Sequence, residues 1–341
     1  MFRGMNKQMR RTYGIDAGAN FLKFAEVNPE TGDFIGEISS FDLTSLLTDK
    51  SRVHKILYEF KKTCPNPKGV GVGICAAGLF NNETLEIIDS PNSTARGVQT
   101  FPAELKKAGY DVVLTNDMPA AVQDSARYGE GKGMENVATL TFSEGCNGSL
   151  ARRIDGRIVN VTQAELGHQR YKKNDSLFCG CGKVGHIEPY VSARGAAAIA
   201  MNFFYMTHVS KHPILDSVAR RLGKQNSLED VSSITAKDVY NAWRIEPGQE
   251  PQKTIREIQV EAITDLFGRV NSSWAPLDII VCMGGQTIDK DLLFYGKDGA
   301  IIRFQQDDGN VQIRGLKKPV VVITSRKEIG ISGAAAYYLS K

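Results

Sequence analysis

A metal-ligand pattern in residues 160–189 constrains this chain more than any other feature of its sequence. Two thiols and two imidazoles occur there, flanked by the carboxylates of Glu165 and Glu188. The four expected ligands are His168, Cys179, Cys181 and His186. Such a set suits tetrahedral Zn²⁺ and leaves no coordination position open, which is typical of a structural site. A chance grouping is the alternative, but the Cys-x-Cys-Gly spacing and the rarity of histidine, 5 in the chain, favour zinc.

Length, composition and charge predict an ordinary globular protein. The 341 residues are enough for about two domains, and 42% of them are hydrophobic. Lys and Arg exceed Asp and Glu by 42 − 38 = 4, which is too weak a bias to indicate nucleic acid or a membrane surface as a partner. No apolar run reaches the length of a membrane span, and the basic start has no apolar stretch behind it. Six cysteines in a chain this long do not predict a disulfide framework, so we expect a cytoplasmic protein with free thiols.

Strands and helices alternate along the chain, which predicts an α/β protein with two sheets. The layout of strand, Gly-containing hairpin and strand occurs twice, beginning near Thr12 and again near Val137, and indicates two related halves. The main expected strands are 12–16, 21–27, 33–39, 69–75, 112–115, 137–142, 277–283 and 319–324. The main expected helices are 49–64, 118–129, 193–207, 254–271 and 331–339. The polar stretch between the two long helices is expected to be partly helical.

Two polar motifs could carry chemistry in the first half. Asp16-Ala-Gly18-Ala-Asn20, with Lys23, lies at a strand-to-strand turn, where glycine permits close approach to phosphate and Asp can hold Mg²⁺. The alternative is an ordinary hairpin. Asn116-Asp117 lies where a strand meets a helix, so Asp117 could accept a proton from a substrate hydroxyl; an N-cap is the alternative, and local sequence favours it.

Two Gly-containing turns in the second half are weaker signals. The backbone amides of residues 143–149 could receive phosphate, although Glu144 would repel it. The glycines of residues 283–287 follow an apolar strand, where they could face a nucleotide or simply form a tight turn.

Taken together and in this order, the motifs resemble the ROK family of bacterial sugar kinases and sugar-responsive repressors. The most specific stretches are Thr115-Asn-Asp-Met-Pro-Ala-Ala, Glu165-Leu-Gly-His168, Cys179-Gly-Cys-Gly with Ile187-Glu188, and Gly330-Ile-Ser-Gly-Ala-Ala. The resemblance implies a two-lobed actin-like ATPase fold of the ribonuclease H type with a central cleft. We expect a flexible tail at 1–11, a small lobe from 12–128 plus 327–341, and a large lobe with the zinc loop at 129–326.

The resemblance also implies roles for individual residues of an ATP-dependent, glucokinase-like hexose kinase. Asp117 would be the general base on the sugar hydroxyl, most often O6. The sugar would be held by Asn116, Glu165, His168, Glu188 and Gly78. ATP and Mg²⁺ would be bound near Asp16, Gly18, Asn20, Lys23, Gly145, Gly148, Gly284 and Gly285. A dimer or tetramer is expected, and a DNA-reading domain does not fit in the residues before the first strand.

Three departures from the family pattern fall in the phosphate loops. Ala19 and Asn20 stand where a Gly and a Thr are usual, and Glu144 falls at the usual Thr of the second loop. A carboxylate beside a triphosphate is unfavourable unless it turns away or meets Mg²⁺. The sequence therefore leaves a second interpretation open, a catalytically weak or silent sugar-binding relative.

Overall fold

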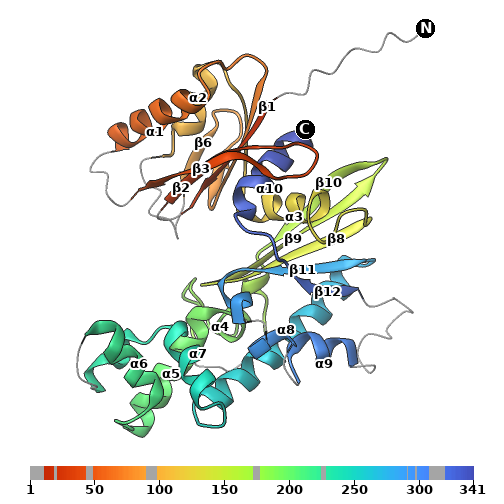
Figure 1. Cartoon of the computed structure of the whole chain (residues 1–341). Coiled ribbons are helices and arrows are strands. Elements are labelled where there is room, and N and C mark those ends of the chain that lie inside the picture. Colours follow the sequence, from red (N-terminus) through yellow and green to blue (C-terminus); the bar gives the residue numbers. More distant parts are fainter. Residues whose placement is uncertain are drawn as a thin grey trace. The chain divides into compact units, whose positions relative to one another are not determined.

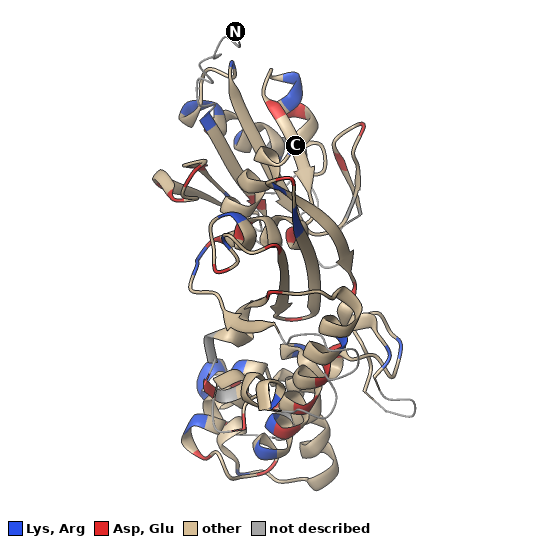
Figure 2. Cartoon of the chain, turned by 90° about the vertical axis from the view of Figure 1, so that its right-hand side faces the viewer, with Lys and Arg blue, Asp and Glu red and all other residues tan. Residues whose placement is uncertain are grey.

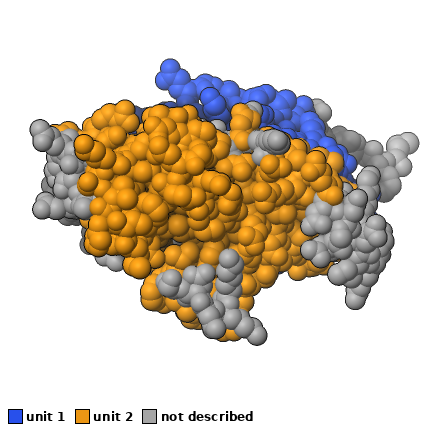
Figure 3. All heavy atoms as spheres, turned by 90° about the horizontal axis from the view of Figure 1, so that it is seen from below, with its two compact units in different colours: residues 1–137, 149–163, 325–341 blue, residues 138–148, 164–324 orange. Residues whose placement is uncertain are grey.

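The computed structural model describes residues 11–18, 21–43, 49–89, 98–171, 177–223, 228–289, 291–295, 298–306 and 319–341. The chain forms two compact units, coloured separately in Figure 3. Unit 1 comprises residues 1–137, 149–163 and 325–341, and unit 2 comprises residues 138–148 and 164–324. Residues 129–137, 149–163 and 325–326, which the sequence analysis placed in the large lobe, belong to unit 1 in this division.

Unit 1 is built on a sheet with the strand order β3-β2-β1-β4-β7. Its strands are β1 (Arg11–Ala17), β2 (Phe21–Val27), β3 (Phe34–Asp42), β4 (Val70–Ala76) and β7 (Asp111–Thr115). β1 runs antiparallel to β2 and parallel to β4, and β4 runs parallel to β7. The carboxyl ends of β1, β4 and β7 therefore meet at one edge of the sheet, and polar residues follow two of these strands.

An aromatic cluster forms the core on one face of this sheet. Phe60 of α1 (Asp49–Thr63) lies edge-on to three rings, with centroid distances of 5.4 Å to Tyr13, 5.1 Å to Phe24 and 5.3 Å to Tyr110. The short helix α2 (Phe101–Lys107) packs beside α1. This apolar cluster fixes α1 and α2 against the sheet.

α10 (Ile329–Leu339) returns from the end of the chain to pack against β1, β4 and α3 (Asp117–Arg127) (Figure 1). Glycines make this close approach possible. A Cβ added at Gly14 would collide with the carbonyl oxygen of Ile331, and one added at Gly73 would collide with that of Ala334. The first turn of α10 therefore packs directly against β1.

A second sheet has the strand order β10-β9-β8-β11-β12. Its strands are β8 (Asn136–Phe142), β9 (Cys146–Ile154), β10 (Arg157–Ala164), β11 (Ile279–Met283) and β12 (Val320–Ile323). Phe142 anchors the apolar core of unit 2, with ring centroids 6.3 Å from Phe267 and 5.3 Å from Phe294. The remaining helices of unit 2 include α5 (Ala193–Thr207), α6 (Pro213–Leu222), α7 (Ala236–Ile245), α8 (Gln252–Trp274) and α9 (Ala300–Gln306).

The predicted α/β class and the main strands and helices are confirmed, with shifts of a few residues at most element ends. The polar stretch after α5 contains two separate helices, α6 and α7. All 6 cysteines are free thiols as expected, and Cys64, Cys75, Cys146 and Cys282 are buried. Within the described residues, no helix combines the length and the apolar character that crossing a membrane requires.

Candidate active site and metal centre

The strand register of unit 1 brings an acidic pair together at one sheet edge. Asp16 of β1 and Thr115 of β7 are both partners of Cys75 in β4, on its two sides. Asp117 follows Thr115 by two residues and opens α3. Asp16 and Asp117 are close enough for the charge of one to raise the pKa of the other. The two polar motifs of unit 1 therefore lie together at the ends of parallel strands.

Asp16 is enclosed by protein. Its Oδ1 lies 3.6 Å from the Cys75 thiol, which also lies 3.2 Å from the carbonyl oxygen of Gly330. A Cβ at Gly330 would collide with the Asp16 carboxylate, so the first turn of α10 fits around this group. Burial raises the pKa of Asp16 to about 6, and the charges of Asp117 and Glu328 act in the same direction. Burial also raises the pKa of the Cys75 thiol well above its ordinary value, so Cys75 is a neutral neighbour.

Asn116 and Asp117 form the N-terminal cap of α3. The Oδ1 of Asn116 accepts from the Met118 amide at 3.4 Å, and that of Asp117 accepts from the same amide at 2.9 Å. The Nδ2 of Asn116 donates to the carbonyl oxygen of Gly78 at 3.2 Å, which joins two residues expected at the sugar. Because the cap fixes both side chains, capping and a role in catalysis are compatible at this position.

Lys23 has a partner that the sequence analysis missed. Its ammonium lies 2.8 Å and 3.0 Å from the two carboxylate oxygens of Glu328, the residue that precedes α10. Glu328 has φ of 52°, a left-handed conformation that is uncommon outside glycine. Gly18 donates its amide to the carbonyl oxygen of Phe21 and so closes the turn, whereas Asn20 lies outside the described residues. The Lys23 charge is therefore balanced by the carboxylate of Glu328.

Three of the four expected metal ligands form one group in unit 2. Each of His168, Cys179 and Cys181 offers an atom within 4.8 Å of those of the other two. His186 adjoins this group: its Nδ1 lies 3.4 Å from the Cys181 sulfur, and its ring centroid lies 5.4 Å from that of His168. Burial and the nearby charge of His168 lower the pKa of His186, so its ring favours the neutral form that binds metals.

Glu188 occupies a space that three glycines leave for it. Its Oε1 accepts from the Gly180 amide at 3.1 Å and lies 3.2 Å from the Cys179 sulfur. A Cβ at Gly145 would lie 2.9 Å from Glu188 Oε2, and one at Gly167 would lie 3.2 Å from the same atom. Glu165 is held separately, because its Oε1 accepts from the side-chain Nδ2 of Asn147 at 3.2 Å. Both carboxylates are thus positioned by the segments that flank the metal ligands.

The remaining glycines predicted near ATP differ in their surroundings. Gly145 lies in the β8–β9 turn beside exposed Glu144. Burial raises the pKa of Tyr240 to about 12, and the charge of Glu144 adds to this rise. Gly148 lies within β9, where a Cβ would collide with Leu166, so packing accounts for this glycine. The positive φ of Gly284, 105°, lets it approach the Phe142 carbonyl, whereas a Cβ at Gly285 would meet nothing within 4 Å.

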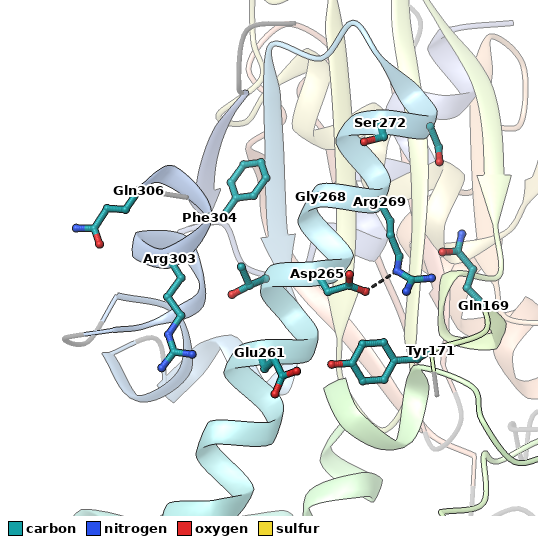
Figure 4. Close-up of a pocket in the computed structure, with 12 residues that line it drawn as sticks. Gln169, Tyr171, Glu261, Asp265, Gly268, Arg269, Ser272, Arg303, Phe304 and Gln306 are labelled. Atoms are coloured by element: carbon teal, nitrogen blue, oxygen red, sulfur yellow. Dashed lines mark hydrogen bonds and ion pairs between the residues drawn. The ribbon is translucent and has the colours of Figure 1, made fainter. Parts of the chain in front are cut away.

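α8 holds the metal-ligand segment through Arg269. Its Nη1 donates to the carbonyl oxygen of Arg170, two residues after His168, at 2.7 Å, and its Nε lies 2.5 Å from Asp265. Figure 4 shows this pair on α8 beside Tyr171, at one side of a hollow of about 1050 Å³ that α9 borders with Arg303. Burial raises the pKa of Tyr171 to about 12, and the adjacent carboxylates Glu261 and Asp265 add to the effect. Only the helical spacing of residues 265 and 269 could have indicated this brace from the sequence.

Comparison with known proteins supports the family resemblance found in the sequence. The family model described as "ROK family" matches residues 12–296. A glucokinase from Streptomyces coelicolor is 30% identical over 194 residues, which are 56% of this chain and 59% of that protein. The chain thus spans about three fifths of that relative. A crystal structure of a ROK family glucokinase from Streptomyces griseus with glucose and AMPPNP has a TM-score of 0.66 at 22% identity, covering 95% of this chain and 98% of that one. A ROK hexokinase from Thermus thermophilus has a TM-score of 0.67 at 17% identity, covering 96% and 97%.

Proposed function

Because the chain belongs to the ROK family and has the actin-like ATPase fold of its structural neighbours, we propose that it is an ATP-dependent sugar kinase. The substrate is proposed to be a hexose, and the acceptor its O6 hydroxyl. The observation that carries this proposal is the pairing of Asp16 and Asp117 at the ends of parallel strands, beside the Gly330 turn of α10.

Asp117 is proposed as the general base. Phosphoryl transfer requires positioning and charge neutralisation more than covalent help from the protein. A carboxylate within reach of the sugar hydroxyl accepts its proton as the oxygen attacks phosphorus, which contributes roughly 10²–10⁴-fold in rate. The Met118 amide fixes the orientation of this carboxylate. Asn116 and Gly78 are proposed to hold the sugar near Asp117, and Glu165, His168 and Glu188 to hold its remaining hydroxyls.

Asp16 is proposed to face the metal-bound phosphates of ATP. A buried carboxylate with a raised pKa gains from a cation, because Mg²⁺ stabilises the charged form that burial disfavours. Gly18, Asn20, Lys23, Gly145, Gly148, Gly284 and Gly285 complete the proposed nucleotide-binding set. Within it, Lys23 can bind phosphate only by exchanging or sharing its contact with Glu328.

We also propose that His168, Cys179, Cys181 and His186 hold one structural Zn²⁺. A tetrahedral zinc ion with ordinary bond lengths separates a sulfur and a nitrogen ligand by about 3.5 Å. The distance from the Cys181 sulfur to His186 Nδ1 is 3.4 Å, so these donors fit. Burial and Glu188 raise the pKa of Cys179 to about 12, and zinc would supply the positive charge that stabilises its thiolate beside this carboxylate.

A coupled assay of ADP release tests the kinase proposal over glucose, mannose, fructose, N-acetylglucosamine and N-acetylmannosamine. We expect ATP-dependent turnover on at least one of them. The exposed Glu144 in the β8–β9 turn supports the alternative of a catalytically silent sugar-binding protein. Sugar binding without turnover, together with no calorimetric signal from an ATP analogue and Mg²⁺, would favour that alternative.

The proposal also covers the oligomeric state of the protein and its cellular compartment. We propose a homodimer or homotetramer in the cytoplasm, with no nucleic-acid partner. Light scattering coupled to size-exclusion chromatography measures the oligomeric state. A mass equal to a single chain at micromolar concentration would contradict the proposed oligomer.

A further inference from the structure

A basic pocket of about 770 Å³ lies at the ends of α3 and α10 in unit 1. Its cationic lining residues are Arg127, Lys132, Arg153, Arg157 and Lys341, and the end of α10 from Leu339 borders it. None of the described residues that line this pocket is Asp or Glu. On the helices of unit 2, by contrast, Lys and Arg alternate with Asp and Glu (Figure 2). The pocket therefore concentrates positive charge in a chain whose formal net charge is only +4.

The fold accounts for only part of this charge. Arg127 is the last residue of α3, and Arg153 Nη2 donates to the carbonyl oxygen of Ala126 at 3.3 Å, so both stabilise the negative end of that helix. The Nε atoms of Arg127 and Arg153 are nevertheless buried without an acceptor among the described residues. The described residues therefore leave part of the hydrogen-bonding capacity of both guanidinium groups unused.

Lys132 and Arg157 have no comparable structural role. Both side chains are exposed, and neither is in an ion pair among the described residues. Asp155 lies in the turn between Arg153 and Arg157 but does not line the pocket. Gly133 and Gly156 leave the mouth open, since a Cβ on either would meet nothing within 4 Å. Like charges held close together repel one another, so a bound anion would relieve this repulsion.

We propose that this pocket binds a small polyanion that carries phosphoryl groups. Arginine binds phosphate through two parallel N–H···O contacts, and lysine adds a compact charge. The volume lies in the range of small-molecule sites, which favours a phosphorylated metabolite or a short phosphate chain. The pocket is at the opposite end of α3 from Asp117, about 16 Å away along a helix of this length, so the site is separate from the proposed catalytic carboxylate. The inference does not depend on the proposed kinase activity.

Isothermal titration calorimetry with the full chain tests the proposal, using inorganic tripolyphosphate and glucose 6-phosphate as probes. The pocket variant carries Lys132→Gln and Arg157→Gln, both at exposed positions, so folding is retained. The matched control carries Lys61→Gln and Lys68→Gln, which remove the same charge from exposed positions outside the pocket. We expect at least one probe to bind the wild-type and control proteins and to bind the pocket variant at least tenfold more weakly.

The two probes distinguish the source of the phosphoryl group. Tighter binding of tripolyphosphate indicates a phosphate chain, and tighter binding of glucose 6-phosphate indicates a phosphorylated sugar. Equal affinities in the pocket variant and the control, or no binding of either probe to the wild-type protein at millimolar concentration, would overturn the proposal.

Discussion

Two groups of polar residues in this molecule differ in how their charges are balanced. In unit 1, the carboxylates beside α10 are enclosed by the protein itself: Asp16 contacts Cys75, and Glu328 pairs with Lys23. In unit 2, two thiols and two imidazoles gather, and the nearest charged neighbour of Cys179 is the carboxylate of Glu188. The protein thus supplies partners for both carboxylates of the first group. The second group brings together donor atoms of the kind that bind zinc, with a carboxylate beside them.

Among the tests of the first group, replacement of Asp117 should have the largest effect. We predict that Asp117→Asn lowers kcat by roughly 10²–10⁴-fold, because the proton acceptor is lost while the N-cap geometry is kept. Sugar affinity, measured by calorimetry, should change by less than about threefold. Asp33→Asn removes an exposed carboxylate of unit 1 and serves as the control with an unchanged rate. Near-normal turnover of Asp117→Asn would remove this residue from its proposed role.

Loss of a metal ligand is the corresponding test of the second group. Chelator-free protein should contain one zinc per chain by elemental analysis. His186→Gln should lose it and destabilise unit 2 by more than about 4 kcal/mol in denaturant unfolding, as loss of a structural metal does. His54→Gln, which changes an exposed histidine of α1, should retain both the zinc and the wild-type stability. Full zinc content in His186→Gln would show that this histidine is not a ligand.

The raised pKa of Asp16 predicts that this carboxylate lowers the stability of the folded protein at neutral pH, whereas the metal ligands are predicted to raise it. Its rise from 3.8 to about 6 means that the folded state binds this proton more tightly than the unfolded state. Stability should therefore fall as the pH rises from about 4 to 6 and then level off. The difference of 6 − 3.8 = 2.2 units corresponds to about 3 kcal/mol, so Asp16→Asn should be more stable than wild type by up to this amount at pH 7.5. Urea unfolding at pH 7.5 and pH 4 measures it, and a gain of the same size at both pH values would contradict the assignment.

The brace on α8 should have the smallest effect. Arg269→Ala removes the contact to the Arg170 carbonyl, so zinc should dissociate at least about tenfold faster into a chelating dye, as outer contacts of metal ligands imply. Arg303→Ala changes an arginine on α9 across the same hollow and should leave the rate unchanged. Equal dissociation rates in the two variants would mean that Arg269 does not support the metal centre.

Local patterns in the sequence predicted most of the fold and both groups of residues. The proposed metal ligands lie close in sequence, from His168 to His186, so their spacing alone indicated a shared site. Asp16 and Asp117 were predicted as separate motifs, and the strand register joined them through Cys75. Glu328 and Arg269 were missed because their partners, Lys23 and Arg170, are far away in the sequence and no local pattern marks such pairs. The basic pocket was missed for the same reason, since its arginines come from α3, β9 and β10.

The chemical product is the most direct test of the account as a whole. Wild-type protein incubated with ATP, Mg²⁺ and each candidate hexose can be followed by ³¹P NMR. The account predicts a new phosphomonoester signal coupled to the C6 protons of at least one sugar, formed as the γ-phosphate signal of ATP declines. Decline of that signal with only inorganic phosphate released, or no decline with any hexose, would contradict the assignment of this chain as a sugar kinase.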